Sequence, residues 1–330
     1  MRTFKLRKEE PLLNIASYAH GGSRAADRLT LAQIEHIRLT VNRAPEVMVK
    51  VLSQGSSDLK AVGRHIDYIG RQGDLELESD DGYRLQGQVG KELIDDWGLD
   101  IDALRPQANL TALPARKPMK LVHKLVFSMP AGTPPQKVLS AVRNFAREEF
   151  HGQHRYAMVL HTDEPHPHVH LVLRAIDEDG RRLNIKKATL RHWRSQFAHQ
   201  LRGLGVAANA TERAVRGESR KSTKDGSYRA SLRGDSTTER ARAEGVAREL
   251  AASGGVRPEL GKRTMLATRA AIQDGWKSVA EKLVLRGDRQ FAADVARFAG
   301  GMDRPLTDRE WLAKEFMASV RARQRELRTL

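Results

Sequence analysis

The sequence predicts an α+β fold with a central, largely antiparallel β-sheet flanked by helices, followed by a basic linker and a mainly helical C-terminal region. Between residues 46 and 203, short runs of apolar and β-branched residues are interspersed with amphipathic helical patterns. Two of these runs are joined by a short loop, as in a hairpin. The composition, 40% hydrophobic and 30% charged, fits a globular chain, and no apolar run is long enough to cross a membrane.

The helices are predicted from apolar residues that recur every three or four positions. Pro45 ends the first of them, because the residue before a proline is pushed out of the α region. The second follows a Gly-Ser-Ser turn that supplies an N-cap, and Gly73 ends it. Its apolar stripe consists of Leu59, Val62, Ile66 and Ile69. The predicted helices cover residues 29–41, 58–71, 91–97, 136–150 and 188–203.

The strands are predicted from short apolar runs bounded by turn residues. The Ser-Asp-Asp-Gly sequence at 79–82 is typical of a hairpin turn, and the loop at 162–167 joins the last two strands. A proline-containing loop is expected at 109–118. The predicted strands cover residues 46–53, 75–78, 83–87, 120–128, 156–161 and 168–175.

The chain is predicted to have four parts. A helical extension covers residues 1–45, and the sheet domain covers residues 46–205. Residues 206–235 are short of large apolar side chains and rich in Arg, Lys, Ser, Thr and Gly, which is typical of a basic linker. Residues 236–330 are rich in Ala, Arg and Leu. Helices fit there at residues 238–252, 264–285, 289–299 and 308–327.

The chain is strongly basic and has no cysteine. Its 57 Lys and Arg residues exceed its 41 Asp and Glu residues, which gives a formal net charge of +16. This charge favours a polyanionic partner, nucleic acid before a membrane surface, although a basic surface kept for solubility stays open. Without cysteine there are no disulfides, thiolate zinc sites or Cys nucleophiles, which fits a reducing cytoplasm. The N-terminus lacks the apolar segment of a signal peptide.

Half of the twelve histidines lie between residues 151 and 170. Side chains alternate along a strand, so His168 and His170 are expected on one face, with His161 opposite them across the hairpin. Three converging imidazoles form a candidate site for a divalent metal that leaves positions open for substrate oxygens. Asp163 and His166, in the connecting loop, are candidates for orienting a ligand or acting as a base. A zinc hydrolase with three histidines stays possible at this point.

Tyr68 is one of five tyrosines and lies near the edge of the apolar stripe of the 58–71 helix. Arg64 and His65 share its helical face, and such a basic setting lowers a phenol pKa or binds a phosphate. The alternative is a half-buried helical tyrosine with its hydroxyl in solvent.

A strand, a Gly-Ser turn, a helix with Tyr68 and then HxDxxHxHVHLV from His161 to Val172 resemble the conjugative relaxases. These mobilisation and T-DNA-border-nicking proteins belong to the histidine–hydrophobic–histidine (HUH) endonuclease superfamily. The resemblance covers about residues 46–205 and implies the HUH relaxase fold. It implies that Tyr68 attacks one DNA strand at a transfer origin and leaves a 5′-phosphotyrosine and a free 3′-hydroxyl, reversibly. His161, His168 and His170 would then hold Mg²⁺ or Mn²⁺ against the scissile phosphate, with Asp163 or His166 orienting or acting as base.

The resemblance also implies single-stranded DNA, accessory proteins of a relaxosome and the coupling protein of a type IV secretion system as partners. It implies a protein of the bacterial cytoplasm, open to export with transferred DNA, without membrane insertion or a small-molecule substrate. The residues predicted to contact DNA are Ser128, Arg64, Arg181, Arg182, Lys186, Lys187, Arg213, Arg216, Arg220, Lys221 and Lys224.

Three alternatives stay open. A rolling-circle replication initiator or single-strand transposase of the same superfamily usually presents its tyrosine after the histidine motif, whereas Tyr68 precedes His161. A metal-dependent nuclease would cut without a covalent intermediate. A basic DNA- or RNA-binding protein would use the metal only structurally.

Overall fold

The computed structural model describes residues 15, 29–52, 57–104, 119–219, 233 and 236–329. The chain forms two compact units. Asn42–Ala210 is called the sheet unit here, and Met1–Val41 together with Thr211–Leu330 the helical unit. The division groups the first part of the chain with the C-terminal helices. The predicted loop at 109–118, residue 53 of the predicted strand, residues 54–56 of the predicted turn, and residues 220–232 and 234–235 of the predicted linker lie outside the described residues.

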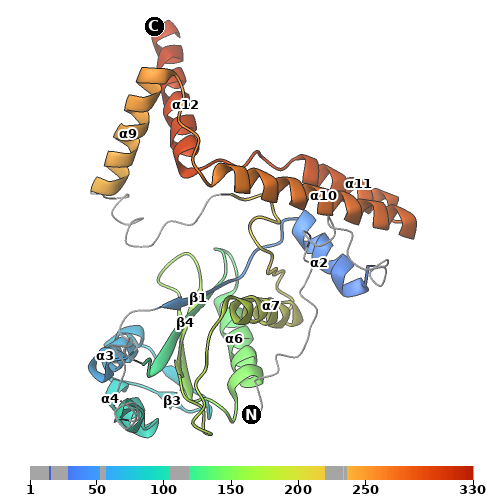
Figure 1. Ribbon diagram of the computed structural model, residues 1–330. Helices are drawn as coiled ribbons and strands as arrows, with labels where there is room; N and C mark the ends of the chain where they lie inside the picture. The colour runs from blue at the N-terminus through green and yellow to red at the C-terminus, as the bar shows by residue number, and fades with distance from the viewer. Residues whose placement is uncertain are drawn as a thin grey trace, which may run out of the picture. The chain divides into compact units, whose positions relative to one another are not determined.

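Six strands in the sheet unit form one sheet with the order β1-β4-β6-β5-β2-β3 (Figure 1). They are β1 (Met48–Leu52), β2 (Leu77–Ser79), β3 (Arg84–Leu85), β4 (Val122–Ser128), β5 (Tyr156–His161) and β6 (His168–Arg174). Every neighbouring pair is antiparallel, so the predicted α+β class with an antiparallel sheet is confirmed. The predicted bounds of β5 and β6 hold to within one residue.

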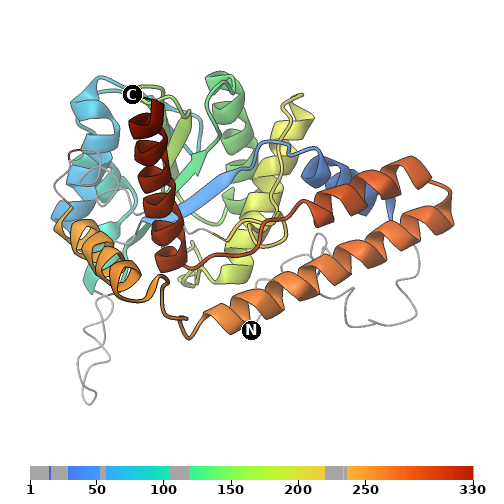
Figure 2. The ribbon, with the colours of Figure 1, turned by 90° about the horizontal axis from the view of Figure 1, so that it is seen from above.

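Helices cover both faces of this sheet (Figures 1 and 2). They are α3 (Leu59–Ile69), η2 (Arg71–Gly73), α4 (Gly90–Asp96), α5 (Leu99–Leu104), α6 (Pro135–Phe150) and α7 (Lys187–Gly203). On one face α6 and α7 bury an aromatic core, where the Phe127 ring lies 5.0 Å from Phe145 and 5.3 Å from Phe197 between centroids. On the other face α3, α4 and α5 pack on a second apolar cluster that includes Val62 and Ile66.

The alternation of β6 separates the core from the face that carries the histidines. Val169, Leu171 and Leu173 are fully buried in the cluster under α6 and α7. Because successive side chains of a strand point to opposite faces, His168 and His170 lie on the α3 face. The same strand therefore contributes to the hydrophobic core and to the polar site.

The helix α3 ends at Ile69, two residues before its predicted end, because Arg71 and Gln72 take left-handed φ angles of 52° and 57°. Gly73 follows with φ 103°, and a Cβ there would lie 2.6 Å from the Gly87 Cα. Only glycine fits both conditions. The helix α5 was not predicted, because six residues are too few to show a helical period.

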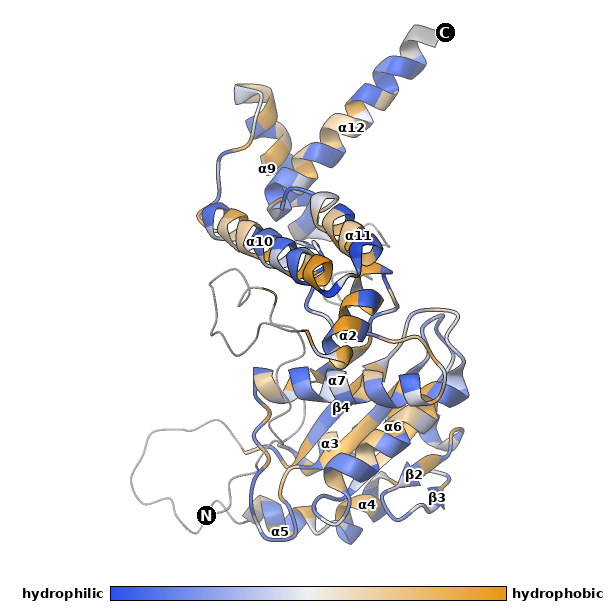
Figure 3. Ribbon diagram, turned by 90° about the vertical axis from the view of Figure 1, so that its right-hand side faces the viewer, coloured by the Kyte–Doolittle hydropathy of each residue, from blue (hydrophilic) through white to orange (hydrophobic). Residues whose placement is uncertain are grey.

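The helical unit contains α2 (Leu31–Val41), α9 (Thr237–Ser253), α10 (Lys262–Arg286), α11 (Arg289–Gly300) and α12 (Asp308–Thr329). Trp276 of α10 is fully buried in its core and donates through Nε1 to the Val215 carbonyl at 3.0 Å. Residues 211–219, predicted as linker, therefore pack against α10. Much of α12 is hydrophilic (Figure 3). In the described part of the chain, no helix has the length and apolarity needed to span a membrane.

Candidate active site

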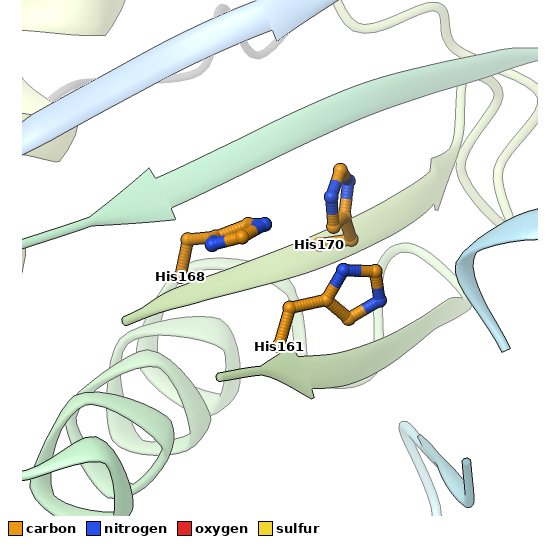
Figure 4. Close-up of side chains that lie close together, drawn as sticks. All are labelled: His161, His168 and His170. Atoms are coloured by element: carbon orange, nitrogen blue, oxygen red, sulfur yellow. The ribbon is translucent and has the colours of Figure 1, made fainter. Parts of the chain in front are cut away.

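Three imidazoles converge on the α3 face of the sheet, from the two strands of the β5–β6 hairpin (Figure 4). His161 and His168 are direct partners in the antiparallel register, and His170 lies two pairs further along β6, opposite Val159. The ring centroids are 4.7 to 5.2 Å apart. One nitrogen of each ring lies within 4.8 Å of the other two. The strands thus bring together the three histidines that the sequence selected.

Backbone carbonyls fix which nitrogen of two rings is free to bind a ligand. His161 Nε2 lies 2.6 Å from the Ile69 carbonyl and must donate to it, so Nδ1 carries the lone pair. His168 Nδ1 donates to the His166 carbonyl at 3.0 Å, which leaves Nε2 available. Carbonyl partners of this kind orient metal-binding histidines and set their tautomers.

Burial keeps two of the imidazoles, His161 and His170, neutral. Burial, followed by the nearby charges of His161 and His168, lowers the pKa of His170 to about 3. Burial also lowers the pKa of His161, against the hydrogen bond to Ile69, which raises it. His170 Nδ1 is buried and has no hydrogen-bond partner among the described residues. Neutral nitrogens at this spacing fit a divalent metal, and imidazole is a better ligand for transition metals than for Mg²⁺.

The helix α3 docks on this cluster on both sides of Tyr68. The His65 ring lies 6.4 Å from the His170 ring, edge to face, and the Ile69 carbonyl accepts from His161. Burial, and then the charge of Lys124, lowers the pKa of His65 to about 4. Tyr68 lies between these two contacts along α3 and is itself 57% exposed to solvent.

Arg71 is a residue of this cluster that the sequence did not predict. Its guanidinium lies 5.7 Å from the centroid of the Tyr68 ring, and its terminal nitrogen lies 3.3 Å from His161 Nδ1. The same nitrogen is ion-paired with the Asp163 carboxylate. The predicted helix ran through Arg71, which would place it only on the helical face of Tyr68, whereas the observed side chain also reaches His161 and Asp163. The left-handed turn supplies this direction, and the only signal for it was the glycine on either side of Arg71-Gln72.

The two loop residues predicted to be catalytic lie in different places. Asp163 is linked to His161 by Arg71, whose guanidinium contacts both side chains. Partial burial raises the pKa of Asp163, but a backbone hydrogen bond and the Arg71 charge hold this pKa below its usual value. His166 is turned to the Met129–Ala131 segment, where its Nδ1 accepts from the Ala131 N–H at 3.0 Å. Asp163 is thus linked to the tyrosine side of the site, and His166 is not.

The residues predicted to bind DNA are spread over both units. Ser128 is paired with His168 in the sheet register but is only 5% exposed. Arg64 is exposed on α3. Arg181 and Arg182 follow the far end of β6, about 20 Å along the strand from His168, so they are not beside the histidines.

Lys186 and Lys187 are exposed where α7 begins. Arg213 and Arg216 belong to the helical unit. Arg216 there pairs with Glu218 at 3.2 Å. Arg220, Lys221 and Lys224 lie outside the described residues.

Comparison with known proteins matches part of this chain to one family. Residues 83–202 match the family described as relaxase, MobA/VirD2-like, nuclease domain. The chain is 24% identical over 204 residues to the T-DNA border endonuclease VirD2 of Rhizobium rhizogenes, which covers 53% of this chain and 42% of that protein. The VirD2 proteins of Agrobacterium fabrum and Rhizobium radiobacter are 24% and 23% identical, over 53% of this chain and 41% and 44% of their own lengths.

The antiparallel sheet with its histidine hairpin and these matches together support a relaxase of the HUH superfamily. The part of the chain that matches, residues 83–202, is similar to the MobA/VirD2-like nuclease domain. It spans less than half the length of the VirD2 proteins it matches. The family match contains all three histidines and begins after Tyr68.

Proposed function

We propose that this chain nicks one strand of DNA at a transfer origin by transesterification, with Tyr68 as the nucleophile and a metal held by His161, His168 and His170. The observation that supports this most directly is the docking of α3 on the histidine cluster. His65 and Ile69, three residues before and one after Tyr68, contact His170 and His161 respectively. The helix that carries the candidate nucleophile is thereby fixed to the strands that carry the candidate metal ligands.

A divalent ion at the three imidazoles would polarise the scissile phosphate and stabilise the charge that develops on its oxygens. Mn²⁺ suits an all-imidazole site better than Mg²⁺ does. His161 would bind through Nδ1 and His168 through Nε2, because the carbonyls of Ile69 and His166 occupy the other nitrogens.

The Tyr68 oxygen forms a bond to phosphorus, and the bond from phosphorus to the 3′ oxygen breaks, so that oxygen leaves and takes up a proton. The phenol proton passes to water at the exposed edge of the site, because the lowered pKa of Asp163 makes it a weak base. His166 remains predicted as an alternative base that would accept the phenol proton. The phosphotyrosine keeps the energy of the broken bond, and attack by a 3′-hydroxyl reverses the reaction.

The proposed substrate is single-stranded DNA, which accords with the basic chain and with relatives named as T-DNA border endonucleases. The histidine face accepts a strand because Tyr68 is open to solvent. Relaxosome accessory proteins and a type IV coupling protein are proposed as the further partners of this chain. The helical unit is the part available for them, because it lies outside the matched nuclease domain.

The test is covalent capture. The protein is mixed with labelled single strands tiled across the DNA that flanks its gene, with Mn²⁺, and SDS-stable adducts are collected. Trypsin cuts after Arg64 and Arg71, so the adduct is expected on the peptide that spans residues 65–71. Sequencing the bound strand and the released strand maps the cut phosphate.

Tyr68→Phe should lower adduct formation by about 10³-fold or more, whereas Tyr83→Phe should not change it. Tyr83 is a matched control because it is also exposed, at 70%, in the β2–β3 turn. His168→Ala should behave like addition of EDTA, and His199→Ala, exposed on α7, should leave the activity unchanged. An adduct that survives Tyr68→Phe would overturn the nucleophile, and cleavage with no adduct would support a hydrolytic nuclease.

A further inference from the structure

Arg71 lies where three functional groups of the site meet. Its guanidinium is over the Tyr68 ring, beside His161 Nδ1 and paired with Asp163. His161 Nδ1 is the nitrogen that the Ile69 carbonyl leaves free. Arg71 thus occupies the space between the candidate nucleophile and a candidate metal ligand.

The backbone turn that carries Arg71 is fixed by its own hydrogen bonds and by packing. Arg71 has a φ of 52°, in the left-handed region that non-glycine residues rarely adopt. The turn is closed by hydrogen bonds from the Gly73 and Leu75 N–H groups to the Gly70 carbonyl, both at 3.0 Å. Its last residue, Gly73, is packed against the backbone of Gly87. An unfavourable conformation that the surroundings enforce at a site is typical of a residue with a role in that site.

We propose that Arg71 binds a non-bridging oxygen of the scissile phosphate and is a catalytic residue of the nicking reaction. This inference rests on the proposed function, because the phosphate must lie between the Tyr68 oxygen and the histidines. A guanidinium presents several fixed N–H donors that match a phosphate bidentately. The Arg71 side chain is 34% exposed, so part of it is open to a ligand.

Asp163 is the positioning residue for Arg71. Its carboxylate pairs with the terminal nitrogen of Arg71 that also approaches His161. A phosphate that binds Arg71 would meet the guanidinium already oriented, so less rotamer freedom is lost on binding. Orienting Arg71 is a reason for Asp163, an acidic residue, to lie in a loop that faces the DNA.

The proposal predicts opposite effects on metal binding and on catalysis. Arg71 donates to the same His161 nitrogen that a metal needs, and it adds a positive charge beside it. Arg71→Gln should therefore bind Mn²⁺ several-fold more tightly in the absence of DNA, while adduct formation falls by about 10²–10³-fold. A residue that only supported the fold of the site would weaken both.

The decisive experiment measures DNA binding in EDTA, where no cleavage occurs. One oligonucleotide spans the mapped cut site, and its partner carries a methylphosphonate in place of the scissile phosphate. Wild-type protein should bind the normal strand about tenfold or more tightly than the modified strand. Arg71→Gln should bind both equally, Arg71→Lys should keep part of the difference, and Arg84→Ala should keep all of it, because Arg84 is exposed on β3.

An unchanged ratio between the two strands in Arg71→Gln would overturn the proposal. Circular dichroism and thermal unfolding of the Lys and Gln variants check that the unit is folded. The test is separate from the proposed function, because a strand cut by hydrolysis without an adduct still maps the phosphate. A protein that cuts no strand would refute both.

Discussion

The position of Tyr68 depends on a close approach between α3 and α4, which the substitution Gly90→Ala should disturb. Gly90 is the first residue of α4, and a Cβ there would lie 2.5 Å from the Gly63 carbonyl oxygen and 2.9 Å from both Asp67 carboxylate oxygens. Real Cβ contacts essentially never fall below 3.0 Å, so the helices must separate by about 0.5 Å or more. The Gly90 N–H also donates to Asp67 Oδ1 at 2.8 Å, and Asp67 precedes Tyr68.

The cost can be worked from these contacts. Overpacking of this kind costs about 1–3 kcal/mol, and weakening a hydrogen bond to a carboxylate costs about a further 1.5–3 kcal/mol. Alanine favours a helix by about 1 kcal/mol over glycine, so we expect a net loss of about 3 kcal/mol in the free energy of unfolding. A displacement of 1 Å can cost about 10²-fold in rate, so about 0.5 Å at Tyr68 should slow adduct formation about tenfold.

Urea unfolding and the single-turnover rate of adduct formation measure these two effects. The matched control is Gly203→Ala at the end of α7, where a Cβ would meet nothing within 4 Å. That substitution should leave the rate unchanged and keep or slightly raise the stability. If Gly90→Ala were as stable and as active as Gly203→Ala, the helix contact would not position the tyrosine and the reasoning would be refuted.

Two further predictions concern sites away from the tyrosine. Burial lowers the pKa of His123 to about 4, against its hydrogen bond to Leu183, so the unfolded chain takes up this proton first as the pH falls. The stability that the neutral His123 contributes is fully present above about pH 6.5 and is lost as the pH falls towards 4. In urea titrations over this range, the free energy of unfolding of the wild type should fall by on the order of 3 kcal/mol more than that of His123→Gln. Parallel pH profiles for the two proteins would contradict this. In the helical unit, Gly275→Ala puts a Cβ 2.0 Å from the Ile15 carbonyl oxygen and should cost about 1–3 kcal/mol. The control Gly245→Ala has open space, and equal melting temperatures for the two variants would show that the contact is not tight.

The histidine hairpin could be predicted from the sequence because its determinants are local. The alternation of β6 fixes the faces of His168 and His170, and the short loop fixes the register that brings His161 opposite His168. The order of the strands in the sheet and the docking of α3 could not be predicted, because they depend on contacts between distant segments. The carbonyl of Ile69 carries no residue-specific signal at all, although it sets the tautomer of His161.

The location of Arg181 and Arg182 shows a second limit of sequence reasoning. They are near the histidines in the chain, but β6 carries the backbone away from the site before it reaches them. Conversely, Arg71 is 90 residues from His161 in the sequence and contacts it. A charged residue that is close to a motif in the sequence need not be close to it in the fold. A single strand of seven residues, such as β6, spans most of a small domain.

Close backbone contacts set how near α3 and its following turn approach α4. Gly63 meets Gly90 where the helices cross, and Gly73 meets Gly87 in the turn that presents Arg71. The apolar stripe of α3 decides which face of the helix is buried, with Val62 and Ile66 in the core cluster. The glycines decide how closely that face can approach its neighbours, because a Cβ at Gly90 or Gly73 would meet backbone atoms. The positions of Tyr68 and Arg71 therefore depend on both.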